Sequence, residues 1–279
     1  MRNPLTCSSH TISGVMPGGP VASRHDFRSR VEACARAGYS GMCLHLRDYA
    51  EQRQANVPAS ELRAILRGNG MVHNSLEFLT GWDGQPAPAA LEPVAWAAAL
   101  ALDAPVLNVG SGPGAPRLDR DRALFEALCS RAAAEGVRVA LEVVPWSRAP
   151  DLPSALRLTD GIANAGLVID CWHVFRGGIA LADVAALDGS RILSVQINDG
   201  LAKPGPDLVA DTRDRRLCGE GAFDLRGFLT AIRQTGTAAP IAVEVISPRL
   251  AAMEVDEAAS VSARTAQAVL DGMAARGSL

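Results

Sequence analysis

The sequence predicts a single (β/α)8 barrel, in which eight parallel strands alternate with helices. The length of 279 residues is close to the size typical of such a barrel, roughly 250 residues. Because 48% of the residues are hydrophobic, the chain can bury a sizeable core. Short apolar runs alternate with longer stretches rich in Ala, Leu and Arg, a pattern typical of βα units. We therefore expect one domain over residues 1–279.

The strands are predicted from eight short apolar runs, and eight is the number that closes a parallel barrel. They are Leu5–His10, Gly41–His45, Met71–Phe78, Val106–Val109, Val137–Val143, Gly166–Asp170, Ile192–Ile197 and Ile241–Val245. Alternation by itself also suits a doubly wound sheet, and GSGPG at Gly110–Gly114 superficially resembles a dinucleotide-binding loop. That segment lacks the GxGxxG spacing and the acidic residue about twenty positions later, so we interpret it as a turn.

The helices are predicted from the longer stretches between these runs. They are Asp26–Ala37, Ala59–Arg67, Ala89–Leu102, Asp119–Ala134, Leu152–Asn164, Ala180–Leu187, Asp224–Thr235 and Met253–Ala275. Asp26 can serve as an N-cap, and Gly38 and Gly68 follow the first two helical patterns as C′ glycines would. The long irregular segment Gly200–Glu220 is predicted to form a lid after the seventh strand, because such loops are uncommon unless they cover a site.

Charge and cysteine content argue against several classes of protein. The net charge is −3 and no basic run occurs, so we expect no nucleic-acid partner. The six cysteines show no CxxC spacing, which favours reduced thiols over a disulfide framework or a zinc cluster. The first residues lack the apolar core of a signal peptide, and no apolar run approaches the ~20 residues of a membrane span. We expect a cytoplasmic protein without a membrane segment.

Polar residues at the carboxyl ends of the strands are the candidates for chemistry, because active sites of barrels lie at that face. Four consecutive strands end on an oxygen ligand: Glu142, Asp170, Gln196 and Glu244. Their flanks are apolar, and three converging carboxylates would repel one another unless a cation lay among them. We therefore expect one divalent metal ion. Oxygen ligands favour Mn²⁺ or Mg²⁺, and we choose Mn²⁺ first, with Co²⁺, Zn²⁺ and Fe²⁺ as alternatives.

Each of these positions also has a structural interpretation. Any one of these acids could equally be a buried structural carboxylate paired with an arginine. That explanation is much weaker for all four positions together. His173 either faces substrate or caps the segment after Asp170. The other candidates for substrate contact, each of which could instead be a core or surface residue, are His10, His45, Arg47, His73, Glu77, Trp146, Arg176 and Asn198. Arginines beyond strand ends can bind an anionic substrate in bidentate fashion, and this favours a substrate that carries a carboxylate or phosphate.

The segments EVVPWSR, DCWH and VQINDG resemble motifs of the xylose isomerase-like TIM-barrel superfamily. That superfamily contains sugar isomerases and epimerases, inosose and 3-dehydroshikimate dehydratases, and metal-dependent AP endonucleases. The resemblance implies that Glu142, Asp170 and Glu244 are metal carboxylates. It also implies that Gln196 replaces the usual histidine ligand, as in bacterial 3-dehydroshikimate dehydratases, and that His173 contacts substrate.

The segment RRLCGEG, Arg215–Gly221, is similar to the R-x-x-P-G-x-G motif of the same superfamily. The resemblance makes Arg215 the arginine that contacts substrate. Cys218 replaces the usual proline, which leaves Arg216 as the alternative to Arg215.

These residues imply an enzyme that removes a proton next to a carbonyl of a small polyhydroxylated substrate while a metal stabilises the enolate. The candidate bases are His173, Glu142 and Glu244, of which we favour His173 or Glu142. The leading hypothesis is a lyase, a dehydratase of a cyclic keto-polyol of the 3-dehydroshikimate or inosose kind. The alternative is a keto-sugar or sugar-phosphate isomerase or epimerase.

Two other classes fit the sequence less well. An AP endonuclease would need a multinuclear metal site and a basic groove for DNA. A non-catalytic binding protein on the same barrel is the second outsider. For the oligomeric state we expect a homodimer, because dimers are the commonest symmetric state.

Overall fold

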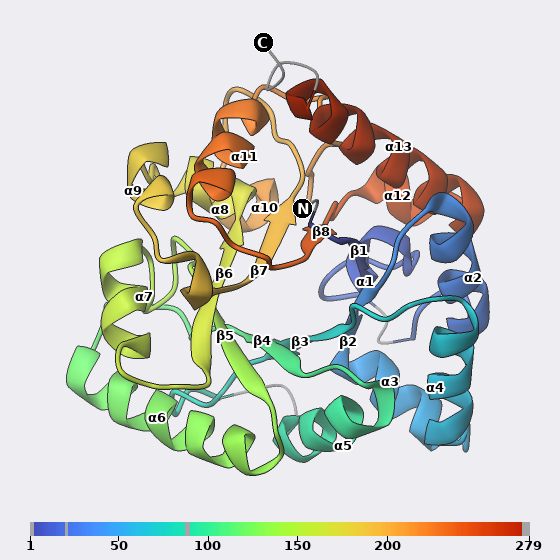
Figure 1. Cartoon of the computed structure of the whole chain (residues 1–279), viewed down its shortest axis with the longest axis horizontal. Helices are drawn as coiled ribbons and strands as arrows, with labels where there is room; N and C mark the ends of the chain where they lie inside the picture. Colours follow the sequence, from blue (N-terminus) through green and yellow to red (C-terminus); the bar gives the residue numbers. More distant parts are fainter. Residues whose placement is uncertain (1–2, 20–21, 87–89, 275–279) are drawn as a thin grey trace.

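The computed structural model describes residues 3–19, 22–86 and 90–274, and its strands form a closed, all-parallel barrel in the order β1 to β8 (Figure 1). The predicted fold class, a TIM barrel, is therefore confirmed. The strands are β1 Leu5–Ser8, β2 Met42–His45, β3 Ser75–Leu79, β4 Val106–Val109, β5 Arg138–Glu142, β6 Ala165–Asp170, β7 Ile192–Ile197 and β8 Ile241–Val243. Closure is made by β1 against β8, with Leu5 opposite Ile241.

Helices surround the barrel (Figure 1). They are α1 Ser9–Ile12, α2 Phe27–Ala37, α3 Leu46–Gln54, α4 Ala59–Gly68, α5 Glu92–Leu102, α6 Leu118–Ala134, α7 Leu152–Thr159, α8 Cys171–Arg176, α9 Leu181–Ala185, the 3-10 helix η1 Gly189–Arg191, α10 Leu208–Asp211, α11 Leu225–Gln234, α12 Pro248–Ala252 and α13 Val255–Ala274. All eight predicted helices are present, with shifted ends. Ala89, the predicted start of one helix, and Ala275, the predicted end of another, lie outside the described residues. The outermost residues of the expected domain lie outside them too.

Local sequence explains the ends of α2. The side chain of Asp26 accepts a hydrogen bond from the backbone N–H of Ser29 at 3.0 Å, and Gly38 takes a left-handed φ of 92°. The prediction for Gly68 was wrong, because this glycine is the last residue of α4 and Gly70 takes the positive φ of 71°.

The third strand starts four residues later than predicted. The backbone N–H groups of Val72 and His73 donate to Ser40 O, at 2.9 and 3.1 Å, instead of joining the ladder. The Asn74 side chain accepts from Met42 N and donates to Met71 O, which closes the turn before β3. This places His73 at the amino end of the strand, on the face of the barrel opposite the expected site.

Several short helices that the sequence analysis did not predict follow strand ends directly. The helices α1, α3 and α8 begin at the residues after β1, β2 and β6, and α12 begins a few residues beyond β8. The helices α1, α8 and α12 are too short to show a clear 3.6-residue pattern, and the nine residues of α3 are mostly polar. Of these helices, α1, α3 and α8 nevertheless carry side chains into the space above the barrel. Within the described ranges, none of the helices is both long enough and apolar enough to cross a membrane.

Candidate active site

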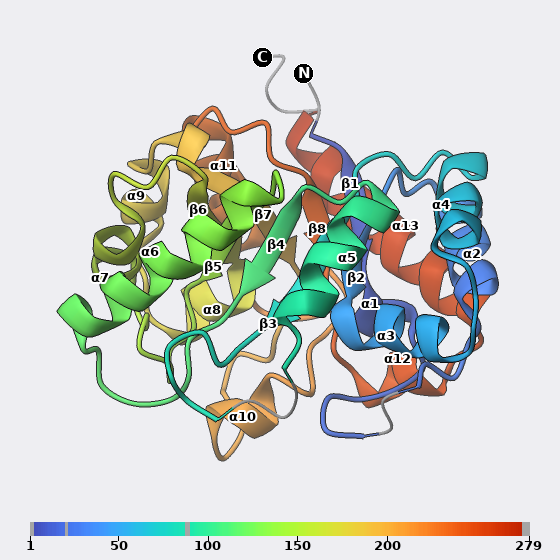
Figure 2. The same ribbon diagram turned by 90° about the horizontal axis from the view of Figure 1, so that it is seen from below.

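A cavity of about 770 Å³ opens at the carboxyl end of the barrel. Its lining includes residues from strand ends and from the short helices, among them His10, His45, Arg47, Glu77, Glu142, Trp146, His173, Gln196, Arg215 and Glu244. The connection Gly110–Pro113 also lines it, as expected for a loop after β4. The predicted lid runs across this end of the molecule: Val209 of α10 and the following Thr212 and Arg213 line the cavity, and α10 lies below the strands in Figure 2.

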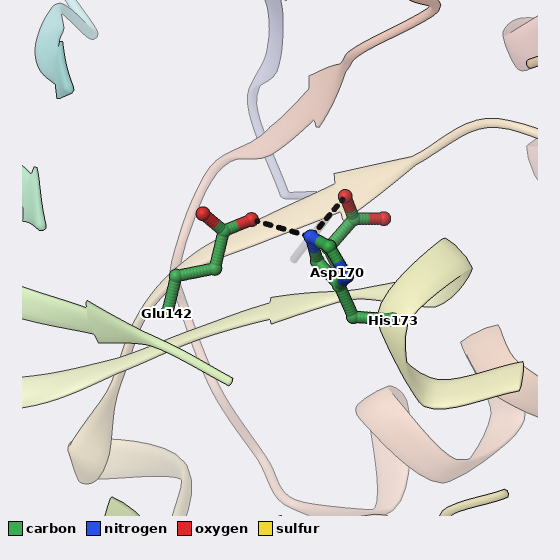
Figure 3. Close-up of side chains that lie close together, drawn as sticks. All are labelled: Glu142, Asp170 and His173. Carbon is green, nitrogen blue, oxygen red and sulfur yellow. Dashed lines mark ion pairs between the residues drawn. The ribbon is translucent and has the colours of Figure 1, made fainter. Parts of the chain in front are cut away.

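Glu142, Asp170 and His173 converge at one side of this cavity, as Figure 3 shows. The Nε2 atom of His173 lies 3.3 Å from Glu142 Oε1 and 3.9 Å from Asp170 Oδ2. Asp170 ends β6 and caps α8 by accepting the backbone N–H of Trp172 at 2.8 Å. That cap starts α8 immediately, so His173, on its first turn, points back towards the two carboxylates. The rings of Trp146 and Trp172 pack edge-on against His173 and restrict its orientation.

Arg215 lies between two of the expected metal ligands. Its Nη1 donates to Asp170 Oδ2 at 2.8 Å and to Glu244 Oε2 at 2.9 Å, and its guanidinium lies over the ring of Trp172. Arg215 is 2% exposed, whereas the neighbouring Arg216 pairs with Asp214 outside the cavity. The structure therefore brings Arg215 to the site and leaves Arg216 outside.

This arginine neutralises only part of the buried negative charge. Burial acts to raise the pKa of Asp170, but Arg215 and His173 lower it below its usual value. Burial is the main reason that the pKa of Glu244 lies well above its usual value; Arg215 opposes this shift, while Glu77, Asp170 and Glu142 add to it. Three carboxyl groups thus face one guanidinium, so a further cation would stabilise their ionised forms.

The donor set fits a divalent metal ion. Gln196 lies opposite Asp170 in the β6–β7 register, and its buried Oε1 accepts no hydrogen bond from any described residue. Carboxylate and amide oxygens are suitable ligands for such an ion. A compact group of potential ligands, however, contains Glu142, Asp170 and His173, with one ligand atom from each lying within 4.8 Å of the others. His173, expected as a substrate contact and a candidate base, is thus also in a position to bind metal.

A second buried network joins the first strands to the eighth. Ser8 Oγ lies 2.8 Å from Glu77 Oε1 and 3.2 Å from Glu244 Oε1, and the Cys43 thiol donates to Glu77 Oε2 at 3.0 Å. Burial raises the pKa of Glu77 to about 7, although the Cys43 and Ser8 hydrogen bonds oppose it. Glu77 therefore holds a proton more readily than a carboxyl group in water does.

Two histidines, His10 and His45, form the wall of the cavity that lies across the barrel from Asp170 and His173. The rings of His10 and His45 lie edge to face, with centroids 5.4 Å apart. Burial, with the neighbouring His45 and Arg215, lowers the pKa of His10 to about 3. Burial and the Arg47 guanidinium lower the pKa of His45 to about 4. Both rings are neutral at physiological pH.

Three predicted substrate contacts lie outside the cavity, which corrects the expectation for each of them. His73 is exposed at the amino end of β3. Asn198 is buried behind the site, where its Nδ2 donates to Asp170 Oδ1 at 3.0 Å. Arg176 donates to Asp211 Oδ2 at 2.6 Å and to Leu201 O, so it holds the lid segment instead of substrate. Both Asn198 and Arg176 act on the site through other residues.

The sequence analysis missed several residues that the fold brings to the site. Ser8 and Cys43 join the Glu77 network, while Thr212 accepts a hydrogen bond from Arg215 Nη2 at 2.9 Å. Arg213 lines the cavity from the lid. Ser8 ends β1, where a polar side chain signals this role. Cys43 lies within β2, and neither it nor the lid residues carry such a signal.

Comparisons with known proteins identify relatives of this chain and structures with the same fold. A 3-dehydroshikimate dehydratase of Pseudomonas aeruginosa is 32% identical over 127 residues, which cover 43% of this chain and 19% of that protein. An inosose isomerase of Halalkalibacterium halodurans is 22% identical over 82% of this chain and 86% of its own. The IolI protein, solved with a bound zinc atom, shares the fold with a TM-score of 0.79 at 17% identity, over 97% of this chain and 99% of that one.

The two sequence relatives are a dehydratase and an isomerase, in agreement with the expected enzyme type. This chain spans only about a fifth of the dehydratase, so its own activity does not follow from that match. The family model described as xylose isomerase-like TIM barrel matches residues 31–269. The chain therefore belongs to the xylose isomerase-like TIM barrel family.

Proposed function

We propose that this protein is a divalent-metal-dependent lyase that dehydrates a cyclic keto-polyol. The observation that carries the proposal is the His173–Glu142 pair, with 3.3 Å between Nε2 and Oε1, next to Asp170 and open to the cavity. A histidine paired with a carboxylate at a barrel mouth is suited to proton transfer. The dehydratase and isomerase relatives support chemistry of this class.

Glu142, Asp170, Gln196 and Glu244 would hold the metal, and Mn²⁺ is our first choice because the donors are oxygens. When bound, a divalent cation supplies Lewis-acid stabilisation of negative charge on a substrate oxygen. The unpaired Oε1 of Gln196 and the excess of carboxylates over guanidinium groups support this ligand set.

His173 is the proposed base. Its Nε2 takes a proton from the carbon next to the substrate carbonyl, and Glu142 stabilises the resulting imidazolium through the 3.3 Å contact. The same Nε2–H then protonates the departing β-hydroxyl, so that water leaves and a carbon–carbon double bond remains. Trp146 and Trp172 hold the ring in place for both steps.

An assay in D₂O with mass spectrometry tests the proposal. The Mn²⁺-loaded protein is incubated with 3-dehydroshikimate and with an inosose, and loss of water is the expected result. The rate of the His173→Gln variant should be lower than that of the wild type by a factor of about 10²–10⁴, which is the contribution typical of a general base. His73→Gln, which changes an exposed histidine away from the cavity, is the matched control. If neither compound loses water, the dehydratase assignment is wrong.

The second candidate is an isomerase or epimerase acting through the same proton abstraction. It is favoured by the inosose isomerase match, which extends over 82% of this chain. Deuterium incorporation without loss of water in the same assay would select it. The homodimer and the cytoplasmic location stay predictions.

A further inference from the structure

Three arginines line the cavity, and they differ in what their guanidinium groups contact: Arg47, Arg213 and Arg215. Arg215 is saturated by Asp170, Glu244 and Thr212. The guanidinium groups of Arg47 and Arg213, in contrast, have no ion pair or hydrogen bond with any residue that the structure describes. Arg47 is half-buried and Arg213 is exposed, so Arg47 is the more enclosed of the two free cations.

The acid next to Arg47 in the sequence is already engaged. Asp48 is buried and accepts from Arg30 Nη2 at 2.8 and 2.7 Å, while Ser23 Oγ donates to it at 3.2 Å. Because Arg30 neutralises this carboxylate, Arg47 has no counterion among the residues that the structure describes. A half-buried guanidinium without a protein partner can pair with an anion that enters the cavity.

His45 adds a directed donor beside Arg47. Its Nδ1 accepts the backbone N–H of Arg47 at 3.2 Å, as the N-cap of α3. A neutral ring that accepts at Nδ1 carries its proton on Nε2, so His45 has one N–H left for a ligand. The side chains of His45 and Arg47 both line the cavity.

The barrel places this pair away from the acidic cluster. His45 ends β2 and Arg47 follows it, whereas Asp170 ends β6 and His173 follows it, four strands further round a ring of eight. With a divalent metal bound, that ion and Arg215 would compensate Glu142, Asp170 and Glu244, so a substrate anion would be attracted mainly by Arg47. This polarity would orient a small anionic ring with its charged group towards β2 and its reacting carbons towards His173.

We propose that Arg47 and the Nε2–H of His45 form a carboxylate-binding subsite, so that the substrate is a cyclic keto-polyol acid. The planar guanidinium matches both oxygens of a carboxylate, and the imidazole N–H provides one further donor. The inference rests on the proposed function and narrows it: 3-dehydroshikimate carries such a carboxylate, and an inosose does not.

Calorimetry on the Mn²⁺-loaded protein tests the subsite without turnover. The probes are shikimate, a carboxylate that lacks the ketone, and myo-inositol, a neutral ring. Shikimate is expected to bind more tightly, and Arg47→Gln should weaken it about ten- to hundredfold, as for a lost charge-assisted pair. Arg53→Gln, an exposed arginine on the same helix but outside the cavity, is the matched control, and circular dichroism checks that both variants fold.

Turnover separates failure of the subsite from failure of the proposed function. A preference for 3-dehydroshikimate over inosose that Arg47→Gln abolishes, mainly through KM, supports the subsite. If both substrates are converted equally and Arg47→Gln changes neither, the subsite is wrong and the dehydratase assignment stands. If neither substrate reacts but shikimate binding depends on Arg47, the subsite stands without that assignment. If a ketose phosphate binds in a way that depends on Arg47 and shikimate does not, the assignment of this subsite to a carboxylate is wrong.

Discussion

Arg215 Nη1 lies 2.8 Å from Asp170 Oδ2 and 2.9 Å from Glu244 Oε2, so one guanidinium joins the carboxyl ends of β6 and β8. All three side chains are buried. Removing one partner of a buried ion pair leaves a charge without compensation, and this costs more than the pair itself stabilises. The stability of this end of the barrel therefore depends on the balance between carboxylates and cations.

Arg215→Met is expected to lower the free energy of unfolding by about 3–5 kcal/mol in the presence of a chelator. Mn²⁺ should restore part of this loss, because a bound cation compensates the same carboxylates. Urea denaturation with and without metal measures both effects. Arg216→Met, which removes an arginine paired at the surface, should change stability by about 1 kcal/mol or less. Equal effects of the two substitutions would contradict this account of Arg215.

Metal binding should depend on Glu142. Glu142→Gln is expected to weaken Mn²⁺ binding at least about tenfold, because it removes a charged oxygen donor from the site. Titration calorimetry and elemental analysis of the dialysed protein give the affinity and stoichiometry. A chelator should lower the Tm of the wild type more than that of the variant, since only the folded state binds the ion tightly. Glu126→Gln, on the exposed face of α6, is the control. If Glu142→Gln binds Mn²⁺ with wild-type affinity, Glu142 is not a metal ligand.

The two histidines of the cavity wall should make the protein sensitive to acid. Their pKa values are about 3 for His10 and about 4 for His45, against 6.5 for an unperturbed histidine. As the pH falls below 6.5, the unfolded chain binds protons that the folded chain excludes, so stability falls between pH 6.5 and 4. Each histidine contributes a slope of at most about 1.4 kcal/mol per pH unit.

The His45→Asn variant separates this contribution from that of other groups. Asparagine keeps an N-cap for α3 but does not titrate, so the decline in stability between pH 6.5 and 4 should become shallower. Urea denaturation at several pH values measures the slope, and His73→Gln, at an exposed position, should leave it unchanged. Parallel curves for wild type and His45→Asn would refute the prediction.

The Arg30–Asp48 pair should be essential for folding stability. Its closest N–O distance is 2.7 Å, with side-chain exposures of 0% and 5%. Asp48→Asn leaves the Arg30 charge buried, and we expect a loss of about 3–5 kcal/mol in the free energy of unfolding. Asp256→Asn breaks a pair of similar length, 2.6 Å, whose side chains are 58% and 65% exposed, and should cost about 1 kcal/mol or less. Thermal denaturation of the two variants compares them, and a larger loss at the surface pair would be inconsistent with burial as the cause.

Most of the fold could be predicted from local sequence, because apolar runs and strand ends are local features. The runs Val106–Val109 and Ile192–Ile197 coincide with β4 and β7, and Glu142, Asp170 and Gln196 each end or nearly end a strand as expected. The short helices α3 and α8 were missed because they give no periodic signal.

The candidate site could be predicted only in part, because a residue's position along the chain does not specify which way its side chain points. His73 was assigned to the wrong end of β3, since the hydrogen bonds to Ser40 that delay the strand come from another element. Asn198 was correctly placed beyond β7, but it bonds Asp170 behind the site instead of lining the cavity.

The sequence by itself determined the strand order and the acidic positions at the barrel mouth, through the alternation of apolar runs with helical stretches. Only the tertiary structure decided which charges meet. Arg215 is 45 residues from Asp170 in the chain, and Ser8 is 236 residues from Glu244. Barrel closure and the β1–β8 register bring these partners within hydrogen-bond distance, and such long-range contacts leave no local pattern in the sequence.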